Sequence, residues 1–171
     1  MKTKLLKIKD IKASANEGFT LIELLVVIGI LAILMGIVLI AINPAHQFAM
    51  ANNTARRNAV AQILSAVGQY EAEHNGALPP KLAAIAASAG TPPVPAPTAI
   101  SSTGVDLCTD LIKGTVQYIP SFPQDPTNNN GVDITDCASY DSGYTISYDA
   151  SKRVTVYAPG AQEGATIQVT R

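Results

Sequence analysis

The amino-terminal part of the chain contains one long, uninterrupted apolar segment. Residues 19–42 read FTLIELLVVIGILAILMGIVLIAI, and Glu23 is the single charged side chain among these 24 residues. A helix of that length extends about 36 Å, which is enough to cross a bilayer core about 30 Å thick. The pattern predicts a membrane-spanning helix over residues 19–42.

An amphipathic segment follows the apolar one and starts at Asn43-Pro44. Asn is a good helix N-cap and Pro is tolerated at the first helical position, so we expect a second helix here, kinked from the first. Between residues 45 and 73 the apolar side chains on one side are Val60, Ile63, Leu64, Val67 and Tyr70. The polar side chains on the other side are Asn58, Gln62, Ser65, Gln69 and Glu73. Asn75-Gly76 is expected to end this helix.

Residues 76–171 have β character in their second half. Residues 144–148 and 153–158 alternate larger apolar side chains with smaller polar ones on either side of a turn-forming DASK segment, which predicts a hairpin. The other expected elements are a short helix at 82–87, a Pro-rich surface loop at 88–99, a strand at 115–119 and an edge strand at 166–170. The predicted fold class is α+β, with one long helix packed on a small antiparallel sheet.

Charge is distributed unevenly along the chain. Residues 1–18 carry five lysines and a net charge of +3, whereas residues 19–171 carry a net charge of −4. Lysines ahead of an apolar helix keep the amino terminus in the cytoplasm, so we expect the part after residue 42 to lie outside. A mildly acidic body disfavours nucleic acid as a partner, because phosphate binding needs a basic surface.

The two cysteines, Cys108 and Cys137, both follow the apolar segment. An even count in an exported chain favours a disulfide over two separate buried thiols. Metal binding is not indicated, because the cysteines and the two histidines show no ligand spacing. The chain has no Gly-rich phosphate loop, no HExxH and no Gly-x-Ser-x-Gly, so it is predicted not to be an enzyme and to need no cofactor.

Glu23 is the residue in the apolar segment that needs an explanation. A carboxylate in hydrocarbon costs about 2.5–3.5 kcal/mol on insertion scales. One interpretation is that Glu23 reaches the headgroups or is protonated, and the other is that it pairs with a cation in an assembly. Cleavage between Gly18 and Phe19 would create such a cation, the new α-amino group, four residues before Glu23.

The stretch Gly18-Phe19-Thr20-Leu21-Ile22-Glu23, followed by LLVVIGILAIL, resembles the class III signal of type IV prepilins and of the pseudopilins of type II secretion. The resemblance extends weakly to about residue 80 and implies a pilin-like fold. It also implies that a prepilin peptidase/methyltransferase cuts after Gly18 and N-methylates Phe19. Glu23 would then aid docking of the subunit into a filament.

The resemblance also gives expectations for the outer part of the chain. Some pseudopilins bind calcium in a loop comparable to residues 125–143, which makes the loop acids weak candidates against the simpler interpretation of solvated acids. These candidates are Asp125, Asp133, Asp136 and Asp141. Arg56 and Arg57 are either solvated or paired with Glu71 or Glu73 of neighbouring subunits.

The expected organisation is a leader over 1–18, a polymerisation helix over 19–42, an amphipathic helix over 43–75 and a globular domain over 76–171 with a disulfide loop at 108–137. The expected function is that of a homo-oligomeric pilus subunit, held in the inner membrane and then assembled into an extracellular filament by dedicated machinery. The alternatives are a minor pilin, a periplasmic pseudopilin of type II secretion and a membrane-tethered binding module that never polymerises. Ordinary signal cleavage near Ala49-Met50-Ala51 is disfavoured, because secretory apolar cores usually run about 7–15 residues and lack an acid.

Overall fold

The computed structural model describes residues 18–88, 96–149 and 151–171. The expected leader therefore lies almost entirely outside the described residues, as does most of the Pro-rich loop. The chain forms two compact units, Met1–Asn43 and Pro44–Arg171, and each is considered by itself.

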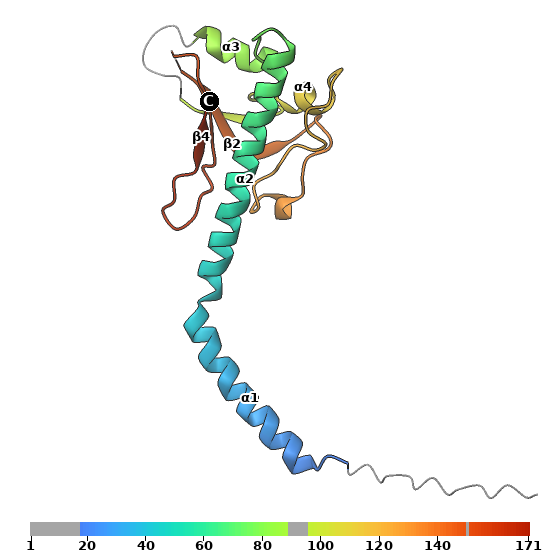
Figure 1. The fold of residues 1–171 in the computed structure, drawn as a ribbon, viewed down its shortest axis with the longest axis vertical. Helices are drawn as coiled ribbons and strands as arrows, with labels where there is room; N and C mark the ends of the chain where they lie inside the picture. Colours follow the sequence, from blue (N-terminus) through green and yellow to red (C-terminus); the bar gives the residue numbers. More distant parts are fainter. Residues whose placement is uncertain (1–17, 89–95, 150) are drawn as a thin grey trace, which may run out of the picture. The chain divides into compact units, whose positions relative to one another are not determined.

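The described residues of the first unit contain one helix, α1 (Leu21–Ile42), shown in Figure 1. It is the only helix among the described residues that is long and apolar enough to span a membrane. At its end Asn43 adopts a left-handed conformation with φ of 45°, which a side chain other than Gly or Asn tolerates poorly. The predicted apolar helix is thus confirmed, with its first turn starting two residues later than the apolar segment.

The second unit is built on the long helix α2 (Pro44–Glu73), with the shorter helices α3 (Pro80–Ser88) and α4 (Cys108–Ile112) and a 3-10 turn at Asn129–Gly131. Asn75 and Gly76, with φ of 55° and 85°, follow the end of α2 as predicted. Of the apolar stripe predicted on α2, Val60, Ile63, Leu64 and Val67 are buried and Tyr70 is half-buried. The polar side predicted opposite it faces solvent.

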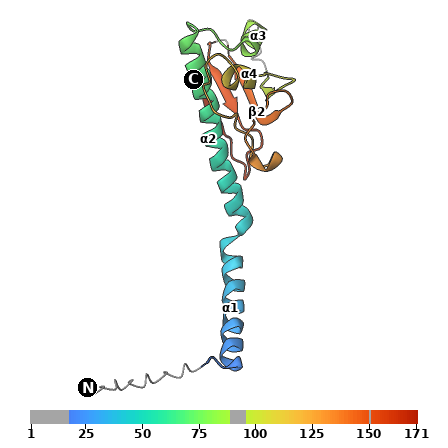
Figure 2. The same ribbon diagram turned by 90° about the vertical axis from the view of Figure 1, so that its right-hand side faces the viewer.

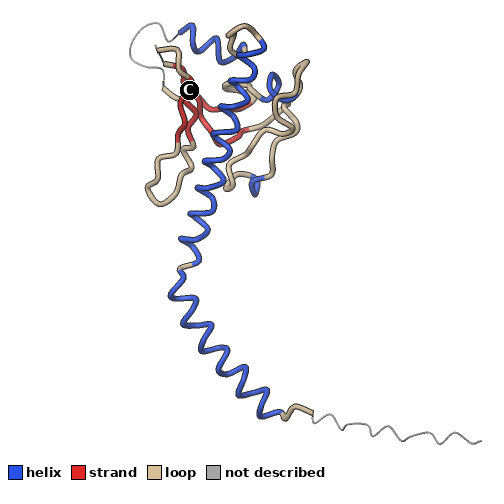
Figure 3. Tube along the Cα trace, viewed as in Figure 1, coloured by secondary structure: helices blue, strands red, loops and turns tan. Residues whose placement is uncertain are grey.

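One antiparallel sheet completes this unit, and Figure 3 shows its strands in red. The strand order is β1-β2-β3-β4, with bounds Thr98–Ser101, Asp141–Tyr148, Val154–Tyr157 and Gln168–Thr170. The predicted hairpin is β2 and β3, in which Ile146 pairs with Val156. Figures 1 and 2 show α2 running alongside the sheet, and α2 contacts β3 and β4. The predicted α+β fold, a long helix on a small antiparallel sheet, is confirmed.

Three local predictions differ from the structure. The strand expected at 115–119 is absent, because the backbone N–H groups of Tyr118 and Ile119 donate to the carbonyl of Leu111 and wrap the chain around the end of α4. The strand β1 replaces the end of the expected Pro-rich loop, because Ile100 is fully buried beside β2. The helix α4 was not predicted, since five residues are too few to show a periodicity.

The predicted disulfide between Cys108 and Cys137 is present, with the two Cα atoms 5.5 Å apart. The bond joins α4 to the loop that precedes β2, and both cysteines are buried in the apolar core. Closing a loop with a sequence separation of 29 stabilises the fold by about 3–4 kcal/mol in the chain-entropy model.

Two buried tyrosines differ in how their hydroxyl groups are satisfied. The Tyr140 hydroxyl accepts hydrogen bonds from the backbone N–H groups of Leu107 and Cys108, at 3.1 and 3.2 Å, and donates to Asp106 at 3.0 Å. The Tyr144 hydroxyl is buried and has no hydrogen-bond partner among the described residues. Burial raises the pKa of both phenols, so both remain protonated at neutral pH.

We therefore expect removal of the hydroxyl to change the free energy of unfolding differently at the two tyrosines. Tyr140→Phe should lower the free energy of unfolding by about 1–3 kcal/mol, because it orphans two backbone donors at the start of α4. Tyr144→Phe should be neutral or stabilising, because it removes a buried polar group without a partner. Thermal unfolding of the detergent-solubilised chain, followed by circular dichroism, measures both. Equal losses of stability in the two variants would show that the hydrogen bonds of the Tyr140 hydroxyl do not contribute to stability.

Candidate functional site

The junction between Gly18 and Phe19 lies outside any helix and is open to solvent. Both residues precede the first turn of α1, and Phe19 is 85% exposed. A Cβ placed on Gly18 would meet no atom within 4 Å. A peptidase needs an accessible peptide bond outside regular secondary structure, and this bond satisfies both requirements.

Glu23 lies in the first turn of α1 and closes a capping box with Thr20. The Thr20 backbone N–H and hydroxyl both donate to Oε2 of Glu23, at 2.9 and 2.6 Å, and the Glu23 backbone N–H donates to the Thr20 hydroxyl at 3.3 Å. Such a reciprocal pair satisfies two donors that every helix N-terminus leaves open. The Glu23 carboxylate therefore has hydrogen-bond donors within its own chain. The sequence had indicated an acid without any partner before assembly. The Thr-x-x-Glu spacing was the signal that would have revealed Thr20.

The capping box also fixes where the Glu23 carboxylate lies. Its Oε2 atom is held 2.9 Å from the backbone nitrogen of Thr20, one residue after the nitrogen that cleavage would convert into an amine. The other oxygen, Oε1, accepts no hydrogen bond from the residues that the structure describes. A cation at the start of α1, in this chain or in a neighbouring one, would therefore find a carboxylate oriented towards it.

The surface of α1 beyond Glu23 is apolar and uncovered. None of its 22 residues is buried, and its large aliphatic side chains remain about half exposed or more. Gly29 and Gly36, seven residues apart, lie on one side of the helix, and a Cβ on either would meet nothing within 4 Å. An apolar surface of this length needs lipid or other helices around it.

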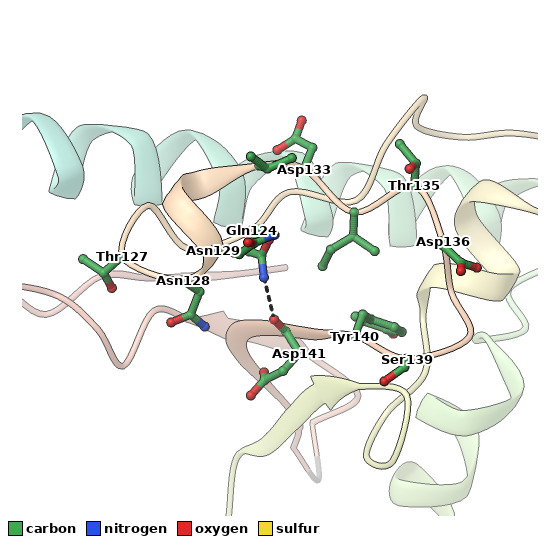
Figure 4. Close-up of a pocket in the computed structure, with 12 residues that line it drawn as sticks. Gln124, Thr127, Asn128, Asn129, Asp133, Thr135, Asp136, Ser139, Tyr140 and Asp141 are labelled. Carbon is green, nitrogen blue, oxygen red and sulfur yellow. Dashed lines mark hydrogen bonds between the residues drawn. The ribbon is translucent and has the colours of Figure 1, made fainter.

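The four loop acids predicted as weak calcium candidates do not form one site. Asp133, Asp136 and Asp141 line a surface hollow of about 580 Å³, but Figure 4 shows their carboxylates pointing in different directions. Each has a protein partner: Ser121 donates to Asp133, Lys113 to Asp136, and the backbone of Gly143 to Asp141. The described residues contain no group of three or more His, Cys, Asp or Glu able to share a metal ion.

Asp125, the fourth candidate, is buried and paired with Arg56. The guanidinium donates from Nε to Oδ2 of Asp125 at 2.7 Å and from Nη2 to Oδ1 at 2.9 Å, and neither side chain is more than 3% exposed. The prediction that Arg56 is solvated or pairs with Glu71 or Glu73 of a neighbour is therefore wrong. Arg56 belongs to the buried face of α2, and its partner is 69 residues away in sequence. Arg57 is exposed, and its predicted pairing between subunits stays a prediction.

The ion pair is embedded in further hydrogen bonds that hold two loops against α2. Thr127 donates to Asp125 through its backbone N–H and its hydroxyl, at 2.9 and 2.6 Å. The buried Asn53 accepts from Arg56 and exchanges two hydrogen bonds with the backbone of Gln162. Burial opposes ionisation of Asp125, but the hydrogen bonds from Arg56 and Thr127 outweigh it and lower the pKa of its carboxyl group.

Comparison with known proteins gives a family motif at the amino end of the chain. The description "prokaryotic N-terminal methylation motif" matches residues 13–39, which include the Gly18-Phe19 bond, the capping box and much of α1. This motif is the class III signal peptide of type IV pilins and pseudopilins. The chain thus has the features of a type IV pilin-like or pseudopilin-like precursor, whose motif implies processing by a prepilin peptidase. No curated protein and no solved structure matches the chain.

The buried pair predicts a large and pH-dependent effect of neutralising Asp125. Asp125→Asn should lower the free energy of unfolding by about 3–5 kcal/mol at pH 7, because it leaves the Arg56 guanidinium buried without its counter-charge. The folded-state pKa of Asp125 is lowered, so the stability it contributes is present above the unfolded-state value of about 4 and is lost as the pH falls through the folded-state value. The difference between wild type and variant should therefore shrink below about pH 4.

Chemical denaturation of the full chain at pH 7 and at several acidic pH values measures this effect. Asp133→Asn is the matched control, since Asp133 lies in the same part of the chain but is exposed. The control should change stability by less than about 0.5 kcal/mol. A similar loss in both variants would contradict a special role for the buried pair.

Proposed function

We propose that this protein is the precursor of a structural filament subunit of the type IV pilus kind. Cleavage after Gly18 and N-methylation of Phe19 yield the mature subunit, which polymerises through α1. The observation that carries the proposal is the position of α1. This fully uncovered apolar helix begins two residues after an exposed Gly18-Phe19 bond, inside a methylation motif.

Before assembly, α1 holds the subunit in the inner membrane. Its 22 residues extend about 33 Å, close to the thickness of a bilayer core. The lysines ahead of it favour a cytoplasmic amino terminus, which puts the Gly18-Phe19 bond at the cytoplasmic face and the second unit outside. The peptidase would therefore act at the inner membrane, before the subunit leaves it.

During assembly, α1 exchanges lipid for the α1 helices of other copies. Helices in such a core associate through close packing, and the open surfaces of Gly29 and Gly36 allow neighbouring backbones to approach. The Glu23 carboxylate, oriented by Thr20, pairs with the methylated amine of Phe19 in the same or an adjacent copy. The pair neutralises two charges that would otherwise remain in an apolar core.

The same motif occurs in pseudopilins of type II secretion, and the place of the filament distinguishes the two functions. A pilus subunit or minor pilin would be found on fibres that extend from the cell surface, whereas a pseudopilin would remain in the periplasm. The disulfide between Cys108 and Cys137 fits both locations, because the periplasm and the cell exterior are both oxidising. Immunolabelling of intact cells decides between the two locations.

Processing is tested by the intact mass of the protein extracted from membranes. We expect a species that lacks residues 1–18 and is heavier than the remaining sequence by one methyl group. In cells without the prepilin peptidase, the full precursor should accumulate, since the bond is then not cut. A mature chain beginning near Asn52 would instead indicate ordinary signal cleavage and would contradict the proposal.

The charge of Glu23 is tested separately from its capping function. Glu23→Gln keeps a side chain that can close the capping box but removes the negative charge. If Glu23 neutralises the Phe19 amine, the amount of assembled filament should fall at least about tenfold, because an uncompensated ammonium would remain in the core. Sedimentation of sheared filaments, with the membrane-bound subunit as loading control, measures the change.

Asp133→Asn, an exposed substitution in the second unit, serves as the control for the loss of one negative charge and should assemble normally. Wild-type amounts of filament from Glu23→Gln would show that capping, and not charge, is what Glu23 contributes. Normal cell-surface display without any polymer would favour a membrane-tethered module instead.

A further inference from the structure

A second candidate binding site is lined by the carboxyl end of α2, by α4 and by the segment after α4. Figure 1 shows α4 near the upper part of α2. It is a hollow of about 520 Å³ with an aromatic wall and two carboxylates. Tyr70 and Tyr118 face each other in a tilted arrangement, with ring centroids 5.6 Å apart, and His74 stacks on Tyr70 at 3.9 Å. The acids are Glu73 and Asp110, and the exposed 114–116 segment forms the rim.

The hollow contains two carboxylates, and no lysine or arginine among the described residues forms an ion pair with either of them. None of the ion pairs among the described residues includes Glu73 or Asp110. Burial and repulsion from Asp106 raise the pKa of Asp110, and the nearby His74 opposes this effect only in part. The Tyr118 hydroxyl donates to Glu73 at 2.9 Å, which orients that carboxylate beside the ring.

The aromatic and acidic groups together are suited to an organic cation. Tyrosine faces attract ammonium and guanidinium groups, and the attraction increases when the site is partly desolvated. A carboxylate beside the ring adds a charge-assisted hydrogen bond. A metal ion fits less well, because no three metal-ligating side chains are grouped among the described residues.

We propose that this hollow binds a guanidinium or alkylammonium group between Tyr70, Tyr118, Glu73 and Asp110. The group has two sources. One is a basic side chain of a second copy, for which Arg57 is suited, because it is exposed on α2 and forms no ion pair with a described residue. This source rests on the proposed filament. The other source is a free organic cation, which does not depend on assembly.

Binding to the hollow is measured by titrating the detergent-solubilised full chain with methylguanidinium, followed by the NMR signals of the His74 ring. Wild type should show saturable shifts. The Glu73→Gln/Asp110→Asn variant should bind at least about tenfold more weakly, because both charge-assisted contacts are lost. Glu73→Gln alone, which keeps an acceptor for Tyr118, should give an intermediate value and guards against misfolding of the double variant.

Glu71→Gln is the matched control, because Glu71 is two residues from Glu73 but does not line this hollow. It should bind methylguanidinium like wild type. Absence of saturable binding to wild type, or equal binding by wild type and both hollow variants, would overturn the proposal. Neither result would affect the proposed filament, since the titration uses unassembled subunits.

Filament yield then identifies the source of the cation. If Arg57 of a second copy is the ligand, Arg57→Glu should reduce the yield, and the charge exchange Arg57→Glu/Glu73→Arg should restore much of it. If Arg57→Glu assembles normally while the titration still shows binding, the ligand is a free cation. Both results are consistent with the hollow as a cation site. If Arg57→Glu loses assembly and the double variant Arg57→Glu/Glu73→Arg does not recover it, Arg57 is excluded as the ligand.

Discussion

The constraint on which the rest of this protein depends is that no residue of α1 is buried by the part of the chain that the structure describes. All 22 of its residues are outside any core, whereas the second unit has a core of its own that involves α2, the sheet and α4. Such a helix is stable only where something else supplies an apolar surface, first lipid and then, in the proposed filament, other copies of itself. The capping box of Thr20 and Glu23 adds the one polar feature of this helix, and it holds the carboxylate at the end where processing would produce an amine.

In the second unit, irregular loops are held in place against one long helix, α2. The buried face of α2 starts at Ala49 and includes Asn53 and Arg56 before it becomes fully apolar at Ala59 and Val60. These two polar residues are tolerated because their groups are satisfied by the 125–127 and 160–163 segments. The disulfide and the Tyr140 hydroxyl hold the chain before β2 against the start of α4. A rigid outer unit presents the same surface in every copy, which a repeating assembly requires.

Close contact between α2 and the carboxyl end of the chain shows how tightly this unit is built. Gly68 lies inside α2, five residues before its end, where glycine normally weakens a helix. Here a Cβ would overlap the guanidinium of Arg171, which follows β4 and pairs through its backbone with Val154. Gly68 therefore leaves space beside α2 for the end of the Arg171 side chain, which is flexible enough to move aside for a larger residue.

The sequence by itself determined the features that are local or periodic: the apolar helix, the buried stripe from Val60 to Val67 and the β2–β3 hairpin. It also favoured the disulfide between Cys108 and Cys137. It also contained the Thr-x-x-Glu capping pattern, although only the structure showed its use. The tertiary structure alone decided what depends on contacts between distant residues. The sequence placed Arg56 on the surface of the helix, but its side chain is buried and pairs with Asp125, 69 positions away. The segment 115–119 has strand-like residues, but its backbone N–H groups donate to the carbonyl of Leu111 in α4. Ile100 lies beside β2, where its side chain is buried. The physical reason is that side-chain periodicity records which face is buried, but not which distant group covers it.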